Sequence, residues 1–170
     1  MRRVWAGWWG IIGVSALLMQ ALWRLTPHAL APWRDGTLSP AQQALYVGWV
    51  GLNAYSEGYR AFQLRFCPRV LRRSLQLSTL PAGQWLPRLL APAYCMGLAW
   101  APRRRMLISW LVLLLIVLAV VLVRRTPQPW RGIIDGGVVV GLAWGWVALW
   151  WQALFGPSVV MVSGNEDEQA

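Results

Sequence analysis

Four polar side chains interrupt an otherwise apolar segment, residues 44–64, and they are the groups in this chain best placed to do chemistry. Asn53, Glu57 and Arg60 recur at intervals of four and three residues, which places them on one face of an α-helix. Gln63 widens this polar face to one side. Glu57 and Arg60 stand one turn apart, so we expect them to form an ion pair that lowers the cost of placing either charge in lipid.

Two interpretations of this polar face remain open. An unpaired charge at the bilayer centre costs about 2.5–3.5 kcal/mol, so the face should turn into a helix bundle or a water-filled cavity. In one interpretation, Glu57 responds to protons or cations, or the face binds a headgroup or a substrate. In the other, the charged pair only locks helix packing near the cytoplasmic interface. The candidate intramembrane polar site is Asn53, Glu57, Arg60 and Gln63.

Motifs for enzymatic or metal chemistry are absent from the sequence. It holds no Ser-His-Asp arrangement, phosphate-binding glycine loop or HExxH motif. The single histidine, His28, is expected to be solvated in a loop. Cys67 and Cys95 lack metal-ligand spacing and are expected to be reduced, small apolar thiols. We therefore expect a non-enzymatic protein without catalytic residues, metal or cofactor.

The class of the chain is set by eighteen uncharged residues between Arg105 and Arg124. As an α-helix this run would reach about 27 Å, close to the ~30 Å hydrocarbon thickness of a bilayer. Hydrophobic residues make up 57% of the 170 residues, which leaves no room for a sizeable soluble domain. We expect an all-α, polytopic integral membrane protein with one transmembrane domain, residues 1–158. Its spans are predicted at about residues 4–23, 44–64, 106–123 and 132–155.

Turn and capping residues predict where these helices begin and end. Three turn signals lie within residues 24–38, which should form a short external loop. The sequence Ser-Pro-Ala-Gln at residues 39–42 predicts a capped helix start. Pro68, directly after Cys67, is expected to end the second helix. The acidic tail, residues 159–170, is predicted to be disordered.

An arginine-rich segment, residues 65–105, lies between the second and third spans. Its first part mixes arginines and apolar residues in a pattern typical of a helix lying in the membrane interface. The uncharged run at 89–101 has thirteen residues, so we expect interfacial or re-entrant helices there, with a fifth span as the alternative. The arginines expected to contact lipid headgroups are Arg69, Arg72, Arg73, Arg103, Arg104 and Arg105.

The charge distribution predicts partners and orientation. All sixteen basic residues are arginine, and the net charge is +10. Because the arginines flank apolar segments, anionic lipid headgroups rather than nucleic acid are the expected partners. With four spans, ten arginines lie on one side and five on the other, and Arg60 is embedded. The positive-inside rule then places both termini in the cytoplasm, in a multi-pass protein of the bacterial inner (plasma) membrane.

Glycines recur every fourth residue in the last span, at Gly137, Gly141 and Gly145. Such a row exposes a flat strip of backbone that another helix can approach closely, so we interpret it as a helix-packing seam. Its partner is expected either within this chain or in a second copy. A matching surface is offered in the first span by Gly7, Gly10 and Gly13.

Two further features belong to the last span. Asp135 lies about 200° around the helix from Gly137, and we expect it to pair with Arg131 near the outer headgroups. Most of the fourteen tryptophans fall near span ends, where the indole ring prefers the headgroup boundary. Trp144 and Trp146 lie deeper and are expected either to contact lipid and neighbouring helices or to line a pocket.

The arginine cluster and the glycine seam favour a small non-enzymatic inner-membrane protein with an accessory or scaffold role. Its expected contacts are anionic lipids and either other membrane subunits or a second copy of the chain. The alternative is a small proton-coupled transporter, as a dimer, that uses Glu57. In size and span number the chain resembles the small multidrug-resistance transporters, which use a membrane-embedded glutamate amid aromatic residues. Their glutamate lies in the first span, whereas Glu57 lies in the second beside Arg60, so the resemblance assigns no residue here.

Overall fold

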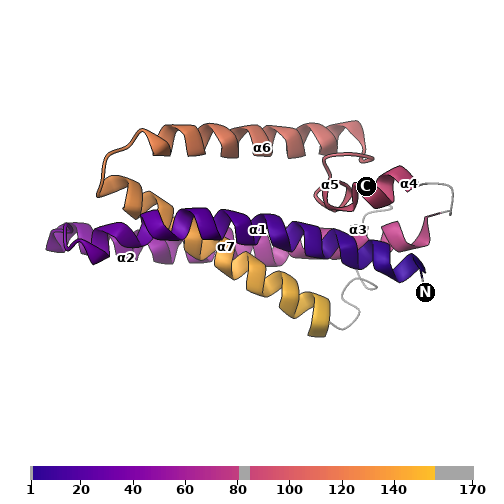
Figure 1. Ribbon diagram of the computed structural model, residues 1–170, viewed down its shortest axis with the longest axis horizontal. Helices are drawn as coiled ribbons and strands as arrows, with labels where there is room; N and C mark the ends of the chain where they lie inside the picture. The colour runs from indigo at the N-terminus through magenta and orange to yellow at the C-terminus, as the bar shows by residue number, and fades with distance from the viewer. Residues whose placement is uncertain (1, 81–84, 156–170) are drawn as a thin grey trace.

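Residues 2–80 and 85–155 are described by the computed structural model, and within them every regular element is a helix (Figure 1). The predicted all-α class is confirmed for this part of the chain. The elements in chain order are α1 Arg2–Arg34, α2 Pro40–Asn53, η1 Ala54–Phe66, α3 Cys67–Thr79, α4 Trp85–Leu89, α5 Ala91–Cys95, α6 Arg103–Arg124 and α7 Trp130–Phe155. The tail predicted to be disordered lies outside the described residues.

Three helices of the described chain are long and apolar enough to cross a bilayer: Gly7–Arg34 within α1, all of α6, and all of α7. The helix over the predicted second span is not among them. Its polar residues, Asn53, Glu57 and Arg60, lower the mean hydropathy of that stretch. Length and composition therefore support three of the four predicted spans.

The second long helix is continuous from residue 40 to residue 79 and comprises α2, η1 and α3. Its start has the predicted capping box, in which the Gln42 N–H donates to Ser39 Oγ and the Ser39 N–H donates to Gln42 Oε1. The predicted end at Pro68 is wrong. In η1 the helix takes a π register, and α-helical bonding resumes at Cys67, so Pro68 lies in the first turn of α3, where a missing N–H costs little.

The first helix also runs further than predicted, because α1 continues through Pro27 and Pro32 to Arg34. The external loop predicted at 24–38 is therefore confined to a few residues before Ser39, and His28 lies half-buried on a helix rather than solvated in a loop. Pro32 has no N–H to offer the carbonyl of His28 four residues earlier. The side-chain amide of Gln128 donates to that carbonyl instead, at 3.5 Å.

The long helices form a bundle with one helix outside it. In Figure 1, α1 and the α2–η1–α3 helix run in opposite directions and α7 crosses them; α1 packs directly against α3, and α7 packs against α1, α2 and η1. The main hydrophobic core lies where α1, α3, α5 and α7 meet, and it consists of Ile11, Val14, Cys67, Val70, Leu71, Cys95, Ala148 and Leu149. By contrast, α6 stands apart from the bundle, and none of its residues is buried.

The segment around residues 89–101 contains two short helices, α4 and α5, and no helix long enough to cross. The short helix α5 packs on α1 at two glycines. A Cβ on Gly10 would lie 2.6 Å from Cys95 Sγ, and a Cβ on Gly13 would overlap the ring of Pro92. These glycines of α1 therefore face α5. The sequence-based suggestion that they match the glycine row of α7 is wrong.

One serine ties α1 to α7. Ser15 is buried, and its Oγ accepts two indole N–H groups, from Trp146 at 2.7 Å and from Trp150 at 2.8 Å. The two indole rings meet edge to face, with centroids 6.5 Å apart. Trp146 and Trp150 thus have fixed hydrogen-bond partners inside the bundle, in addition to their contacts with the surrounding medium.

We expect Ser15→Ala to lower the free energy of unfolding by about 1–3 kcal/mol, because both indole N–H groups lose their acceptor. The measurement is denaturant unfolding of the purified protein in detergent micelles. Ser56→Ala is the matched control, since Ser56 is exposed and bonds only the Leu52 carbonyl of its own helix. Equal, small effects of the two substitutions would contradict a role for Ser15 in holding α1 against α7.

Candidate functional site

The π register of η1 separates Glu57 from Arg60 in the predicted polar site. A π-helix closes its hydrogen bonds between residues five apart, so a turn holds more residues than an α-helical turn. Side chains three positions apart then no longer share a face. Asn53 is buried, whereas Glu57 and Arg60 are exposed, and no ion pair joins these two described residues. The single polar face and the Glu57–Arg60 pair that the sequence predicts are not formed.

Residues four or five apart do share a face in this helix. Asn53, Gly58 and Phe62 all lie against α7, and Gly58 is close to the Cβ of Trp144. The buried Asn53 amide donates to the Trp49 carbonyl at 2.8 Å, so its nitrogen has a partner within its own helix. Of the predicted polar site, Asn53 is therefore buried in the interface with α7, and Glu57 lies beside it at Gly141.

The three glycines of the predicted seam lie against this same face. A Cβ on Gly137 would lie 2.5 Å from the indole nitrogen of Trp49, and a Cβ on Gly145 would lie 2.5 Å from the ring of Phe62. At Gly141 there is more room, and the nearest atom is the Cβ of Glu57 at 3.2 Å. The helix that approaches this glycine row is therefore the α2–η1 helix of the same chain.

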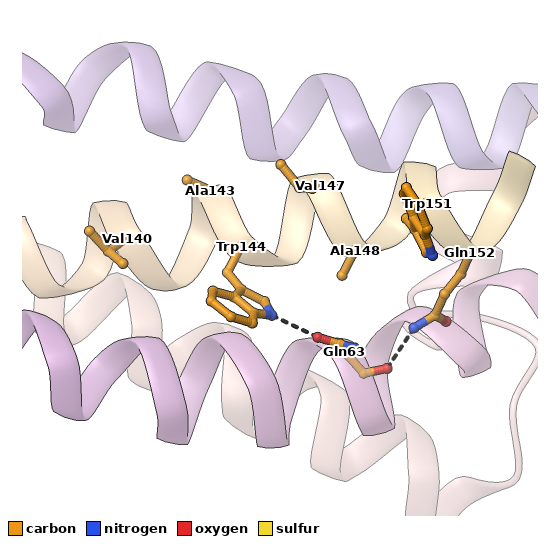
Figure 2. A pocket seen from close by; sticks show the side chains of 8 residues that line it. All are labelled: Gln63, Val140, Ala143, Trp144, Val147, Ala148, Trp151 and Gln152. Atoms are coloured by element: carbon orange, nitrogen blue, oxygen red, sulfur yellow. Dashed lines mark hydrogen bonds between the residues drawn. The ribbon is translucent and has the colours of Figure 1, made fainter. Parts of the chain in front are cut away.

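Gln63, the fourth residue of the predicted site, lies at a pocket between η1 and α7. Its Oε1 accepts the indole N–H of Trp144 at 2.8 Å, and its main-chain carbonyl accepts the amide of Gln152 at 2.9 Å (Figure 2). The pocket has a volume of about 550 Å³ and is otherwise lined by apolar side chains of α7, from Val140 to Trp151. Both roles left open for Trp144 are seen, because it lines the pocket and also packs against Gly58 of η1.

Glu57 and Arg60 are not among the residues that line this pocket. The Glu57 carboxylate lies beside Gly141, with Oε2 3.3 Å from the position of a Cβ on that glycine. Arg60 is exposed on η1. The sequence reasoning missed Gln152, which completes the polar end of the pocket, because nothing in the local sequence links it to Gln63.

Asp135 forms the predicted contact with Arg131, with Arg131 Nε 3.6 Å from Asp135 Oδ2. Asp135 is buried, however, instead of facing the outer headgroups. Neither of these two atoms has a hydrogen-bond partner within the described residues. Nearby, the hydroxyl of the buried Tyr46 donates to the Ala29 carbonyl at 3.1 Å, which links α2 to α1 at this end of the bundle.

The arginines predicted to contact headgroups lie on α3 and on the first turn of α6, at one end of the molecule (Figure 1). Burial, and then the charges of Arg105 and Arg65, lower the pKa of the Arg69 guanidinium, so cations distant in sequence come close in space. Arg103, Arg104 and Arg105 are exposed. We call this end of the molecule the arginine end; its members are Arg65, Arg69, Arg72, Arg73, Arg103, Arg104 and Arg105.

Arg73 has a structural contact as well. Its Nη2 donates to the Trp100 carbonyl at 2.8 Å, and its guanidinium lies 4.4 Å from the centre of the Tyr94 ring. The same loop accepts hydrogen bonds from α6, because the indole of Trp110 donates to the Leu98 carbonyl at 3.0 Å. Gly97, with a φ of 77°, gives the loop the left-handed turn that these contacts require.

Cys67 and Cys95 are free and buried. Burial raises the pKa of the Cys95 thiol to about 11, so it stays protonated at neutral pH. Within residues 2–80 and 85–155, no group of three or more His, Cys, Asp or Glu side chains could hold a metal ion.

No protein family, curated protein or solved structure matches this chain.

We expect Gly145→Ala to destabilise the fold by about 1–3 kcal/mol, because the added methyl group would overlap the ring of Phe62. Gly51→Ala is the matched control, since a Cβ there has no atom within 4 Å. It should stabilise the helix by up to about 1 kcal/mol, the difference in helix propensity. Thermal unfolding in one detergent would compare the two, and equal shifts would contradict close packing at the glycine seam.

Proposed function

We propose that this chain crosses the membrane four times. Three helices have the length and composition of spans, and two of them, α1 and α6, run in the same direction (Figure 1). The chain must therefore return across the bilayer between them. The α2–η1–α3 helix runs in the direction opposite to α1 and lies between α1 and α6 in the sequence. Its contacts with α7 cover Asn53, which reduces the cost of its polar residues.

The proposed orientation places the arginine end in the cytoplasm of a bacterial cell. Ten arginines then lie inside and five outside, in agreement with the positive-inside rule. The N-terminus and the end of α7 lie on the same side as the arginine end in this arrangement, which makes both termini cytoplasmic. The membrane is the inner, or plasma, membrane.

The proposed function is that of a non-enzymatic accessory or scaffold protein, which holds anionic lipids at its arginine end and contacts other membrane proteins through its spans. The observation that carries this proposal is the position of the arginines of α3 and of the first turn of α6 at the same end of the molecule, where the charges of Arg65 and Arg105 act on Arg69. Cations placed together in this way repel one another, and anionic headgroups relieve that repulsion. Each arginine near an anionic surface contributes about 1 kcal/mol of attraction.

Two exposed charges favour a protein partner as well. Glu57 and Arg60 are both exposed and form no pair with each other, at the depth of the proposed second span. Direct exposure of such charges to lipid is costly. A second copy of the chain or another membrane subunit that covers this side of η1 would supply the missing polar contacts. The position of Glu57 outside the pocket gives less support to a transport role.

The four-span arrangement predicts that the loop after α1 and the start of α6 lie on opposite sides of the membrane. Thr37→Cys should react with a membrane-impermeant maleimide in intact cells, whereas Arg103→Cys should react only after permeabilisation. The parent protein should not react, since Cys67 and Cys95 are buried. Labelling of both variants from the same side would show that the α2–η1–α3 helix does not cross.

The lipid-binding role predicts that Arg104→Gln combined with Arg105→Gln removes up to about 2 kcal/mol of the stabilisation that anionic lipid provides. The measurement is the rise in unfolding free energy when phosphatidylglycerol is added to phosphatidylcholine nanodiscs. The matched control combines Arg24→Gln with Arg34→Gln, two exposed arginines outside the arginine end, and should lose much less. Equal losses would contradict a special role for the cluster. Proton-linked transport in vesicles that disappears in Glu57→Gln would overturn the accessory role.

A further inference from the structure

We infer that the pocket between η1 and α7 binds a neutral lipid whose hydrocarbon chain ends in a hydroxyl group. This inference uses the membrane location of the chain but not its proposed accessory role. The pocket volume of about 550 Å³ falls within the range of small-molecule sites, which are mostly apolar with a few fixed polar groups.

The shape of the lining matches a lipid chain. Apolar side chains of α7 line the pocket from Val140 to Trp151, and the glutamines Gln63 and Gln152 supply its polar atoms (Figure 2). From residue 140 to residue 152 a helix rises by about 18 Å. Trp144, Val147 and Trp151 are largely exposed, so a ligand can enter sideways from the bilayer. A hydrocarbon chain can lie along this apolar strip without the loss of hydration that a polar group would suffer there.

The polar end of the pocket lies at the depth where lipid headgroups begin. Gln63 precedes Arg65 by two residues, and Gln152 lies three residues before the end of α7 at Phe155. Val140 lies further into the span. A lipid bound with its chain toward Val140 and its polar end at the glutamines therefore has the same orientation as the surrounding lipids.

Hydrogen bonds within the protein leave amide N–H donors and the Oε1 acceptor of Gln152 free for the ligand. Gln63 Oε1 accepts from Trp144, and Gln152 Nε2 donates to the Gln63 carbonyl. The amide N–H groups of Gln63 and the Oε1 of Gln152 take part in no hydrogen bond within the described residues. A hydroxyl group both donates and accepts, so it satisfies these two groups with one atom. An ester or ether oxygen only accepts and would leave Gln152 Oε1 unsatisfied.

The lining also selects against charged lipids. No charged side chain is among the described residues that line the pocket. A phosphate or carboxylate placed there would lose its hydration without gaining a cation. Two membrane compounds carry the required chemistry, an acylglycerol with a free hydroxyl and an isoprenoid alcohol, and the experiment below distinguishes them.

The test is photocrosslinking of the full-length protein in phosphatidylcholine nanodiscs. The probes are a diacylglycerol and a polyprenol, each with a diazirine in its hydrocarbon chain. At least one of the two probes should label the peptide that spans residues 140–152. The O-methyl ether of that probe should label the peptide about tenfold less, because the ether oxygen cannot donate to Gln152. The probe that labels more strongly identifies the source of the hydroxyl.

Variants connect the labelling to the two glutamines. Gln63→Leu and Gln152→Leu should each reduce labelling about tenfold, whereas Gln20→Leu, an exposed glutamine on α1, should not. Val147→Trp fills the pocket but keeps both amides and should also block labelling, unlike Val121→Trp on the exposed α6. These variants keep the test decisive if a glutamine variant fails to fold.

Three outcomes would overturn the inference. The first is equal labelling by the alcohol and its methyl ether. The second is equal or stronger labelling of residues 140–152 by phosphatidylglycerol with the same diazirine chain. The third is failure of both alcohols to label this peptide in the parent protein. None of these results depends on the arginine end. They therefore do not bear on the proposed accessory role, which the arginine substitutions test separately.

Discussion

The close approach of α7 to the α2–η1 helix is the contact on which the rest of the structure depends. It requires glycine at 137 and 145, because aromatic side chains of the facing helix occupy the space where a Cβ would lie, and Gly141 between them lies close to Glu57. Because an α-helix has 3.6 residues per turn, a row of residues spaced four apart winds gradually around the helix axis. The π register of η1 brings residues four or five apart onto one face, so the two surfaces stay in contact along their length. The pocket, the buried Asn53 and the exposed Glu57 all follow from this pairing.

Features encoded in neighbouring residues could be predicted from the sequence. The capping box at Ser39, the apolar run of α6 and the contact of Arg131 with Asp135 depend on residues at most four apart or on composition. The polar site could not be predicted in the same way. The intervals between Asn53, Glu57 and Arg60 indicate a shared face only if the helix is α-helical. The segment with the changed register packs against a helix some eighty residues away, a contact that the spacing of these residues does not reveal.

The lengths of helices also depend on residues distant in the sequence. Two prolines near the end of α1 predict a loop, yet the helix continues, and Gln128, a hundred residues later, bonds the carbonyl that Pro32 leaves free. Ser15 likewise gains its role only from Trp146 and Trp150 on another helix. In each case a polar group of the backbone or of a side chain is satisfied by a partner distant in the sequence. Local sequence patterns therefore predict where the helices occur, but not their lengths or the contacts between them.

The isolation of α6 has a consequence for how this sequence can change over evolutionary time. None of its residues is buried by a neighbouring helix, so its side chains need only be apolar, and leucine, isoleucine and valine should exchange freely along most of its length. Residues near its start that bond the adjoining loop, such as Trp110, are exceptions. In α7, which is also apolar, a single added methyl group at a glycine meets another side chain. Homologues should therefore diverge fastest in the most hydrophobic helix of the chain.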